Sequence, residues 1–295
     1  MQLWQSILLG LIEGITEYLP ISSTGHLVVA QQLMGVGTLN ATDKIAADTF
    51  AICIQGGAII AVLGLYLAHV KKMIFGLLGR DQEGWQMLKA IIIGFMPAAV
   101  LGMLLNDFID EKLMFLWPIV SAWFVGGLAI LGVAFWKKKQ GKESNGKSLL
   151  EITWKMALVI GLMQCVAMWP GTSRSLMTIV GGILVGLSVK AAVEYSFLLG
   201  VLTLTAATAK KAVWKIDALP EYDTWFGGAK LLWTHYGAAP TCVGMLAAAI
   251  SAAIAVKWLV SYLQSHGLEL FGWYRVAAAS VVAILVLSGV VPHIS

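Results

Sequence analysis

The chain has 295 residues, of which 59% are apolar and 12% are charged, and its formal net charge at pH 7 is +4. An average soluble domain carries about 25% charged residues, so this composition excludes an ordinary soluble domain and indicates a polytopic membrane protein. The basic residues lie mostly between apolar segments, which is typical of a membrane surface. It is not the footprint of a nucleic-acid-binding protein, so no nucleic-acid partner is expected.

Six stretches are long and apolar enough to cross a bilayer as helices, because a span takes about 20 mostly apolar residues. They are residues 45–68, 85–105, 113–136, 190–209, 237–260 and 272–291. Two further apolar regions, 1–36 and 152–187, are each interrupted near the middle by polar residues together with proline and glycine. Proline and the residue before it disfavour a continuous helix, and irregular backbone survives at membrane depth only where protein or water covers it. We therefore expect an all-α protein with six transmembrane helices and two re-entrant helical hairpins.

The two halves of the chain resemble each other at an offset of 151 residues, which is the separation of Ser22 and Ser173. Residues 10–13 then align with residues 161–164. Each half has one hairpin and three spans, and an odd number of spans predicts an inverted-topology repeat whose broken elements meet near the midplane. The expected organisation is a single membrane domain over 1–295, with repeat 1 at about 1–136 and repeat 2 at about 148–295.

Two connecting segments, 69–84 and 137–147, are rich in Lys and Arg, and such loops lie in the cytoplasm. Their basic residues are Lys71, Lys72, Arg80, Lys137, Lys138, Lys139, Lys142 and Lys147, whereas the intervening segment carries Asp107, Asp110 and Glu111. This pattern predicts that both termini lie outside the cytoplasm. The segment 210–235 does not fit this orientation, because it holds Lys210, Lys211, Lys215 and Lys230 against Asp217, Glu221 and Asp223.

Glu13 and Glu17 are ionisable residues inside an apolar hairpin arm, where charges are costly and usually functional. Their spacing of four puts them on one face of a helix. Two adjacent carboxylates repel unless they share a proton or a cation, and oxygen ligands suit Mg²⁺ or Ca²⁺. The alternative is that one glutamate is neutral and the other is paired with Arg174.

The turn after Glu17 contains Ser22, Ser23 and Thr24, followed by His26. These hydroxyls and the imidazole supply a nucleophile and a proton carrier. The same residue types also serve as hydrogen-bonding partners in helix packing, so this pattern alone leaves both interpretations open.

The second turn holds Arg174 among Thr172, Ser173 and Ser175. A guanidinium binds phosphate through a planar fork of donors, and the helix that follows presents N-terminal amides to an anion. If the two hairpins meet, carboxylates, hydroxyls, His26 and Arg174 form a metal-assisted phosphate site. An anion or proton transport site of similar composition remains the alternative.

Two other polar residues have less specific surroundings. Gln55 begins a Gln-Gly-Gly run within a span, where it either contacts the site or packs helix against helix. Arg275 lies near the start of the last span, and we expect it to extend to the membrane surface or to reach a lipid headgroup.

The segments 13–26 and 170–178 resemble the two signatures of the bacterial undecaprenyl-pyrophosphate phosphatases of the integral-membrane, bacitracin-resistance type. The first reads E-G-I-T-E and continues to S-S-T-G-H, which is similar to the family's E/Q-x-x-x-E and its Ser-Ser-Thr-Gly-His turn. The second reads P-G-T-S-R-S-L-M-T, which is similar to P-G-x-S-R-S-x-x-T. The likeness continues at residues 50–60, 94–97, 194–199 and 274–275, and so covers nearly the whole chain.

The resemblance implies hydrolysis of a C55 polyprenyl diphosphate to the monophosphate and phosphate, which recycles the carrier lipid for peptidoglycan synthesis and gives bacitracin resistance. Glu13 and Glu17 are then expected to hold a divalent cation, Mg or Ca, and Arg174 to bind the diphosphate. Ser23 is the candidate nucleophile and His26 its acid/base partner, while attack by His26 or by water stays open. Further phosphate contacts are expected from Ser22, Thr24, Ser173 and Thr178.

The resemblance also implies a location in the bacterial plasma membrane, with the lipid bilayer and the polyprenyl diphosphate as partners; a homodimer is left open. Counting spans from the basic segments places the active site on the extracytoplasmic side. The alternative function is a transporter or flippase of the carrier lipid or of a phosphate-like anion, because inverted repeats with broken helices suit alternating access.

Overall fold

Helices make up the regular secondary structure of the computed structural model, which describes residues 1–140, 146–213, 216 and 219–289. Within this part there are twelve α-helices, two short 3-10 turns and no β-strand. The α-helices are α1 (Leu3–Tyr18), α2 (Ser23–Leu33), α3 (Ala41–Leu65), α4 (Leu67–Leu77), α5 (Gln82–Lys112), α6 (Leu116–Gln140), α7 (Trp154–Val166), α8 (Arg174–Leu184), α9 (Val189–Val213), α10 (Gly227–His235), α11 (Ala238–His266) and α12 (Glu269–Leu287). The prediction of an all-α fold is confirmed.

Six helices of the described residues are long and apolar enough to cross a membrane, and each overlaps one predicted stretch. The apolar spans are Ala41–Leu65, Gln82–Leu105, Leu116–Phe135, Val189–Val213, Ala238–His266 and Glu269–Leu287. Several helices run beyond the apolar residues because capping groups, and not hydropathy, set their ends. The Asp81 side chain accepts a hydrogen bond from the Gly84 amide at 2.9 Å and so starts α5. Gly267, with φ of +71°, ends α11.

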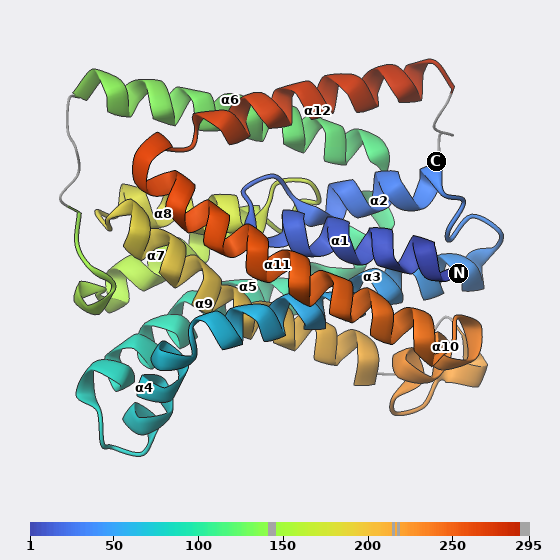
Figure 1. Cartoon of the computed structure of the whole chain (residues 1–295), viewed down its shortest axis with the longest axis horizontal. Helices are drawn as coiled ribbons and strands as arrows, with labels where there is room; N and C mark the ends of the chain where they lie inside the picture. Colours follow the sequence, from blue (N-terminus) through green and yellow to red (C-terminus); the bar gives the residue numbers. More distant parts are fainter. Residues whose placement is uncertain (141–145, 214–215, 217–218, 290–295) are drawn as a thin grey trace.

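The two interrupted regions fold as two pairs of short helices, α1 with α2 and α7 with α8 (Figure 1). The first pair breaks between Tyr18 and Ser23, around Leu19-Pro20, and the second between Val166 and Arg174. The residue just before the second helix of each pair, Ser22 or Ser173, has a positive φ of 72° or 77°. A serine in this conformation is uncommon, so both turns make the same strained entry into a helix.

Helices also form in two segments that the sequence analysis treats as connections. α4 covers Leu67–Leu77 and so overlaps the start of residues 69–84, where Lys72 pairs with Glu83 at 3.0 Å, and α10 lies within 210–235. Lys142, Lys215 and Asp217, used above to predict orientation, lie outside the described residues. So do the side chains of Asp107, Asp110, Glu111, Lys137, Lys138 and Lys139.

Glycines allow the short first helix of each pair to approach a long helix closely. α1 packs on α11, where a Cβ added at Gly10 would lie 2.3 Å from the Gly244 carbonyl oxygen. α7 packs on α5, where a Cβ at Gly161 would lie 2.4 Å from the Gly94 carbonyl oxygen. Small residues at such contacts are typical of helix packing in membranes. α6 and α12 run side by side along one edge of the molecule (Figure 1).

Candidate active site

The turns of the two helix pairs meet near the centre of the molecule (Figure 1). The Ser175 hydroxyl, at the start of α8, donates a hydrogen bond to the Leu19 carbonyl at 2.9 Å. Arg174 of the second turn pairs with Glu17 of the first, with 2.7 Å between Nη2 and Oε1. Residues more than 150 positions apart in the chain therefore share one site, as the sequence analysis requires for a phosphate site.

Arg174 is held by groups on three sides. Its Nη1 donates to the Ser196 carbonyl at 3.1 Å, and its guanidinium lies 5.6 Å from the centre of the Tyr18 ring. Gly200 leaves room for it, because a Cβ there would lie 2.0 Å from Nη1. The buried Nε has no hydrogen-bond partner among the described residues. Since a guanidinium has five N–H donors, Arg174 keeps donors for an anion while it is fixed by Glu17 and Ser196.

Glu17 and Ser23 form the second part of the site. The Ser23 hydroxyl, at the first residue of α2, donates a short hydrogen bond to Glu17 Oε2. Both oxygens of this carboxylate are thus engaged, one with Arg174 and one with Ser23. The pairing of Glu17 with Arg174 is half of the alternative weighed above, in which the other glutamate is neutral.

Glu13 lies one turn before Glu17 on α1 and is completely buried. Neither of its carboxylate oxygens has a hydrogen-bond partner among the described residues. A buried carboxylate without a partner is strongly unfavourable, so Glu13 needs a proton or a cation beside it.

The donor set fits a divalent cation of the Mg²⁺ type. The described residues contain no group of three or more His, Cys, Asp or Glu side chains able to hold a metal. Mg²⁺, however, is commonly bound by one or two carboxylates together with substrate phosphates. The unpartnered oxygens of Glu13, next to the carboxylate of Glu17, match that arrangement.

Both ring nitrogens of His26 bond groups other than Ser23 and Glu17. Because the Ser22 carbonyl can only accept, Nδ1 of His26 donates to it at 2.7 Å, and Nε2 then accepts from the Tyr274 hydroxyl at 2.7 Å. The imidazole ring also stacks on Tyr274, with ring centres 5.7 Å apart. The acid/base role of His26 stays a prediction, and the group that contacts Ser23 Oγ here is Glu17.

A cavity of about 490 Å³ opens onto these groups between α2, α3, α9 and the turn before α8. The predicted site residues that line it are Glu17, Ser22, Ser23, Thr24, Gln55, Ser173 and Arg174. Glu13, His26 and Thr178 are not among its lining residues; Thr178 is buried and bonds the Ser196 hydroxyl at 2.6 Å. Lys44 and Lys211 also line the cavity, and the sequence analysis did not place them there.

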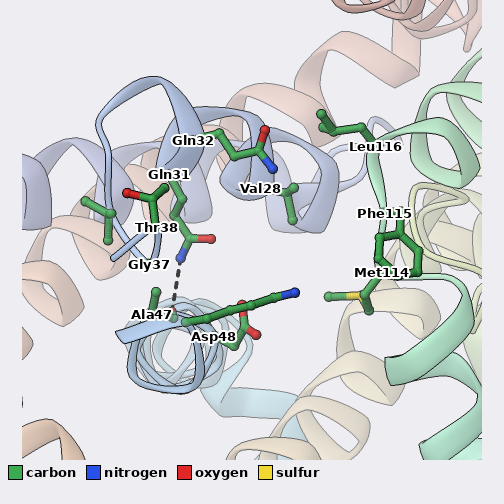
Figure 2. A pocket seen from close by; sticks show the side chains of 12 residues that line it. Val28, Gln31, Gln32, Gly37, Thr38, Ala47, Asp48, Met114, Phe115 and Leu116 are labelled. Carbon is green, nitrogen blue, oxygen red and sulfur yellow. Dashed lines mark hydrogen bonds between the residues drawn. The ribbon is translucent and has the colours of Figure 1, made fainter. Parts of the chain in front are cut away.

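A smaller cavity of about 50 Å³ lies beside the first, between α2, α3 and residues 114–116 (Figure 2). The two cavities share the lining residues Val28, Gln31, Lys44, Asp48 and Met114. Ala47 lines only the smaller one. The Gln31 amide donates to the Ala47 carbonyl at 3.0 Å, which ties α2 to α3 (Figure 2). Gln31 also lines the larger cavity, so this bond holds one of that cavity's lining residues.

Arg275 occupies a place that the sequence analysis did not foresee. Its side chain is completely buried, so the expectation that it reaches the membrane surface or a headgroup is wrong. Nη2 donates to the carbonyls of Ala122 at 2.8 Å and Gly171 at 2.9 Å, and Nη1 donates to that of Pro20 at 3.4 Å. Arg275 therefore connects both turns to α6. The only sequence signal for this buried, carbonyl-bound position was that Arg275 is a lone arginine in an apolar stretch.

Six candidate spans and an arginine–carboxylate–serine cluster between two broken helix pairs define, in the described residues, a polytopic membrane protein with a buried polar cluster. The model of the bacitracin resistance protein BacA family matches residues 6–281, and the chain belongs to this family. It is 40% identical over 287 residues to undecaprenyl-diphosphatase 2 of Rhodospirillum rubrum, covering 97% of this chain and 96% of that protein. It is 36% identical over 289 residues to the undecaprenyl-diphosphatase of Nitrosospira multiformis, covering 98% and 97%.

Proposed function

We infer that the chain is an undecaprenyl-diphosphatase, which hydrolyses the C55 polyprenyl diphosphate to the monophosphate and inorganic phosphate. The observation that carries this inference is the hydrogen-bonded chain Arg174–Glu17–Ser23 at the wall of one cavity. It combines an anion-binding fork with an activated hydroxyl, which is what cleavage of a phosphoric anhydride needs. Carrier-lipid recycling for the cell wall and resistance to bacitracin follow from this activity.

In the reaction that this geometry supports, Ser23 attacks the terminal phosphorus. Its Oγ forms a bond to phosphorus, the bond from phosphorus to the bridging oxygen breaks, and the polyprenyl monophosphate leaves with that oxygen. Glu17 Oε2 accepts the Ser23 proton, since it already accepts the hydrogen bond. Water then cleaves the phosphoserine and releases phosphate. Arg174 donates to the terminal phosphate oxygens throughout and stabilises the charge that develops on them.

Glu13 and Glu17 hold a divalent cation, Mg or Ca, in this proposal. Bound there, the cation supplies Lewis-acid charge neutralisation for the diphosphate. The unpartnered, fully buried oxygens of Glu13 support it. The substrate is positioned by four residues that line the cavity, Ser22, Thr24, Gln55 and Ser173. Thr178 does not line it and acts through its hydrogen bond to the Ser196 hydroxyl.

The two helix pairs are re-entrant hairpins of an inverted repeat, in our proposal. Two glycine contacts support it, because each joins a helix pair of one half of the chain to a long helix of the other half. Gly10 contacts Gly244, and Gly161 contacts Gly94. Gly10 and Gly161 are 151 positions apart, and Gly94 and Gly244 are 150 apart. A twofold relation between the halves explains why each hairpin packs on the other half's long helix.

The active-site cavity opens to the extracytoplasmic side of the bacterial plasma membrane in the same proposal. The basic connections around Lys72 and Lys147 support this orientation. It also matches where a carrier lipid arrives after it has delivered its sugar cargo. A homodimer stays a prediction.

Phosphate release from the polyprenyl diphosphate by protein purified in detergent tests the enzymatic function. No gradient exists there, so a transporter or flippase releases nothing. We expect Ser23→Ala to abolish turnover and still bind the diphosphate, while the exposed Ser280→Ala, on α12, retains full activity. Normal turnover by Ser23→Ala would assign the attack to water or His26, and absence of release by the unchanged chain would contradict the enzymatic function.

A further inference from the structure

A second large cavity, of about 540 Å³, lies between α5, α6 and the turn that connects α7 with α8. We call it the α5–α6 groove. Its lining is almost entirely apolar and comprises Leu105, Phe108, Ile109, Leu113, Ser121, Ala122, Val125, Gly126, Ala129, Cys165, Val166, Met168, Trp169, Thr172 and Met177. None of the described charged side chains lines it. A cavity of this character binds an apolar ligand and not a headgroup.

The α5–α6 groove adjoins the active-site cavity. Ile109 of α5 and Met168 of the second turn line both of them. A diphosphate held by Arg174 in the first cavity therefore has an apolar passage beside it. The groove also opens to the outer surface of the helices, because its lining residues Phe108 and Val125 are 58% and 64% exposed. In a bilayer, apolar side chains exposed in this way face the acyl chains.

Small residues on α6 form the floor of the groove. Ala122, Gly126 and Ala129 follow one another at spacings of four and three, which places them on one helix face. Gly126 is required by the buried Arg275, since a Cβ there would lie 2.4 Å from Nη2. Ala129 also lines the groove but is exposed, so the packing of the fold leaves room for a larger side chain there.

We propose that the α5–α6 groove binds the first isoprene units of the polyprenyl tail. This rests on the proposed diphosphatase function and adds the site that recognises the tail. The remaining units extend into the bilayer past Phe108 and Val125. An apolar cavity of about 150 Å³ holds a benzene molecule, so the groove has room for roughly three five-carbon units. Each of the first three or so isoprene units should therefore raise the affinity for the diphosphate, whereas further units should leave the affinity unchanged.

Ala129→Phe tests this proposal, because its ring fills the distal part of the groove. Ala129 lies seven residues beyond Ala122, or about 10 Å along α6, so the shortest tail does not reach it. We expect KM to rise about tenfold, or about 1.4 kcal/mol, for C15 and C55 diphosphates. For the C5 diphosphate, dimethylallyl diphosphate, kcat and KM should stay unchanged. The control is Ala277→Phe on α12, an exposed alanine outside both cavities.

Native Cys165 provides a second readout that does not depend on turnover, because its half-buried thiol lines the groove. In a Cys242→Ser background, which removes the exposed cysteine, a non-hydrolysable farnesyl diphosphonate should slow alkylation of Cys165 at least fivefold. The dimethylallyl diphosphonate should leave the rate unchanged.

Two kinetic results overturn the proposal: equal KM values for Ala129→Phe and the unchanged chain at every tail length, or an equal rise in KM for C5, C15 and C55. Protection of Cys165 by both diphosphonates alike also overturns it. These outcomes are separate from a failure of the diphosphatase function. In that case the unchanged chain releases no phosphate from any diphosphate, while Cys165 protection still reports where the tail binds.

Discussion

Replacing Arg275 by lysine keeps the charge and removes the fork, which isolates what the guanidinium geometry contributes. Three different nitrogens of Arg275 donate to backbone carbonyls: Nη2 to Ala122 and Gly171, Nη1 to Pro20 and Nε to Trp123. A lysine ammonium is a single point with three donors, so it cannot reach both turns and α6 together. At least one turn therefore loses its attachment.

The expected loss of stability follows from these distances. Interhelical hydrogen bonds between neutral groups in membranes contribute about 0.6 kcal/mol on average, whereas bonds from a charged donor contribute about 1.5–3 kcal/mol. Only the two Nη2 bonds, at 2.8 and 2.9 Å, are short, and those to Pro20 and Trp123 are 3.4 Å long. Loss of one short bond and weakening of the others should destabilise the fold by about 3 kcal/mol.

Thermal unfolding of detergent-solubilised protein and steady-state kinetics measure the two consequences. Arg275→Lys should unfold at a lower temperature and lose kcat more than it raises KM, because Arg275 lines neither cavity and acts on the position of the turns. The exposed Arg80→Lys is the matched control and should change neither quantity. An Arg275→Lys protein with unchanged unfolding temperature and unchanged kcat would refute the idea that Arg275 holds the turns.

Three further predictions concern the site and its orientation. Arg174→Lys should lose most of its kcat/KM despite the retained charge, because a point charge cannot bind Glu17 and phosphate as a fork does; an unchanged kcat/KM would make Arg174 a simple counter-ion. Glu13→Gln should abolish the dependence of activity on divalent cations and most of the activity, and full activity of this variant in a chelator would contradict the cation site. In a background without native cysteines, a membrane-impermeant thiol reagent applied to intact cells should label Thr24→Cys and not Arg80→Cys, and the reverse pattern would invert the orientation.

Hydropathy and turn chemistry predicted the architecture because both act locally. Each of the six apolar stretches became a long helix, and the prolines at positions 20 and 170 mark the two breaks. The sequence also indicated which residues converge, since a buried arginine and buried glutamates need each other. The pair between Arg174 and Glu17 is the outcome.

Contacts that depend on tertiary placement could not be predicted. His26 bonds Tyr274, which is 248 residues away, and no periodicity relates the two. Arg275 is satisfied by backbone carbonyls, which every residue carries, so no sequence pattern identifies its partners. The helices α4 and α10 escaped prediction because their lengths are too short for a span and their charges resemble those of a loop.

The charges of the buried site link substrate binding to cation binding. With both glutamates ionised, Glu13, Glu17 and Arg174 carry a summed formal charge of −1. A diphosphate adds further negative charge, and like charges in a low-dielectric interior repel strongly. Only a proton or a cation at Glu13 removes this repulsion, and only the cation also attracts the diphosphate. Cation and diphosphate should therefore each raise the affinity for the other by the same factor.

Thermal unfolding measures this coupling. A non-hydrolysable diphosphonate should raise the unfolding temperature much more with Mg²⁺ than in a chelator, and Glu13→Gln should remove that difference. Equal stabilisation in both conditions by the unchanged chain would show that Glu13 carries a proton when the diphosphate binds.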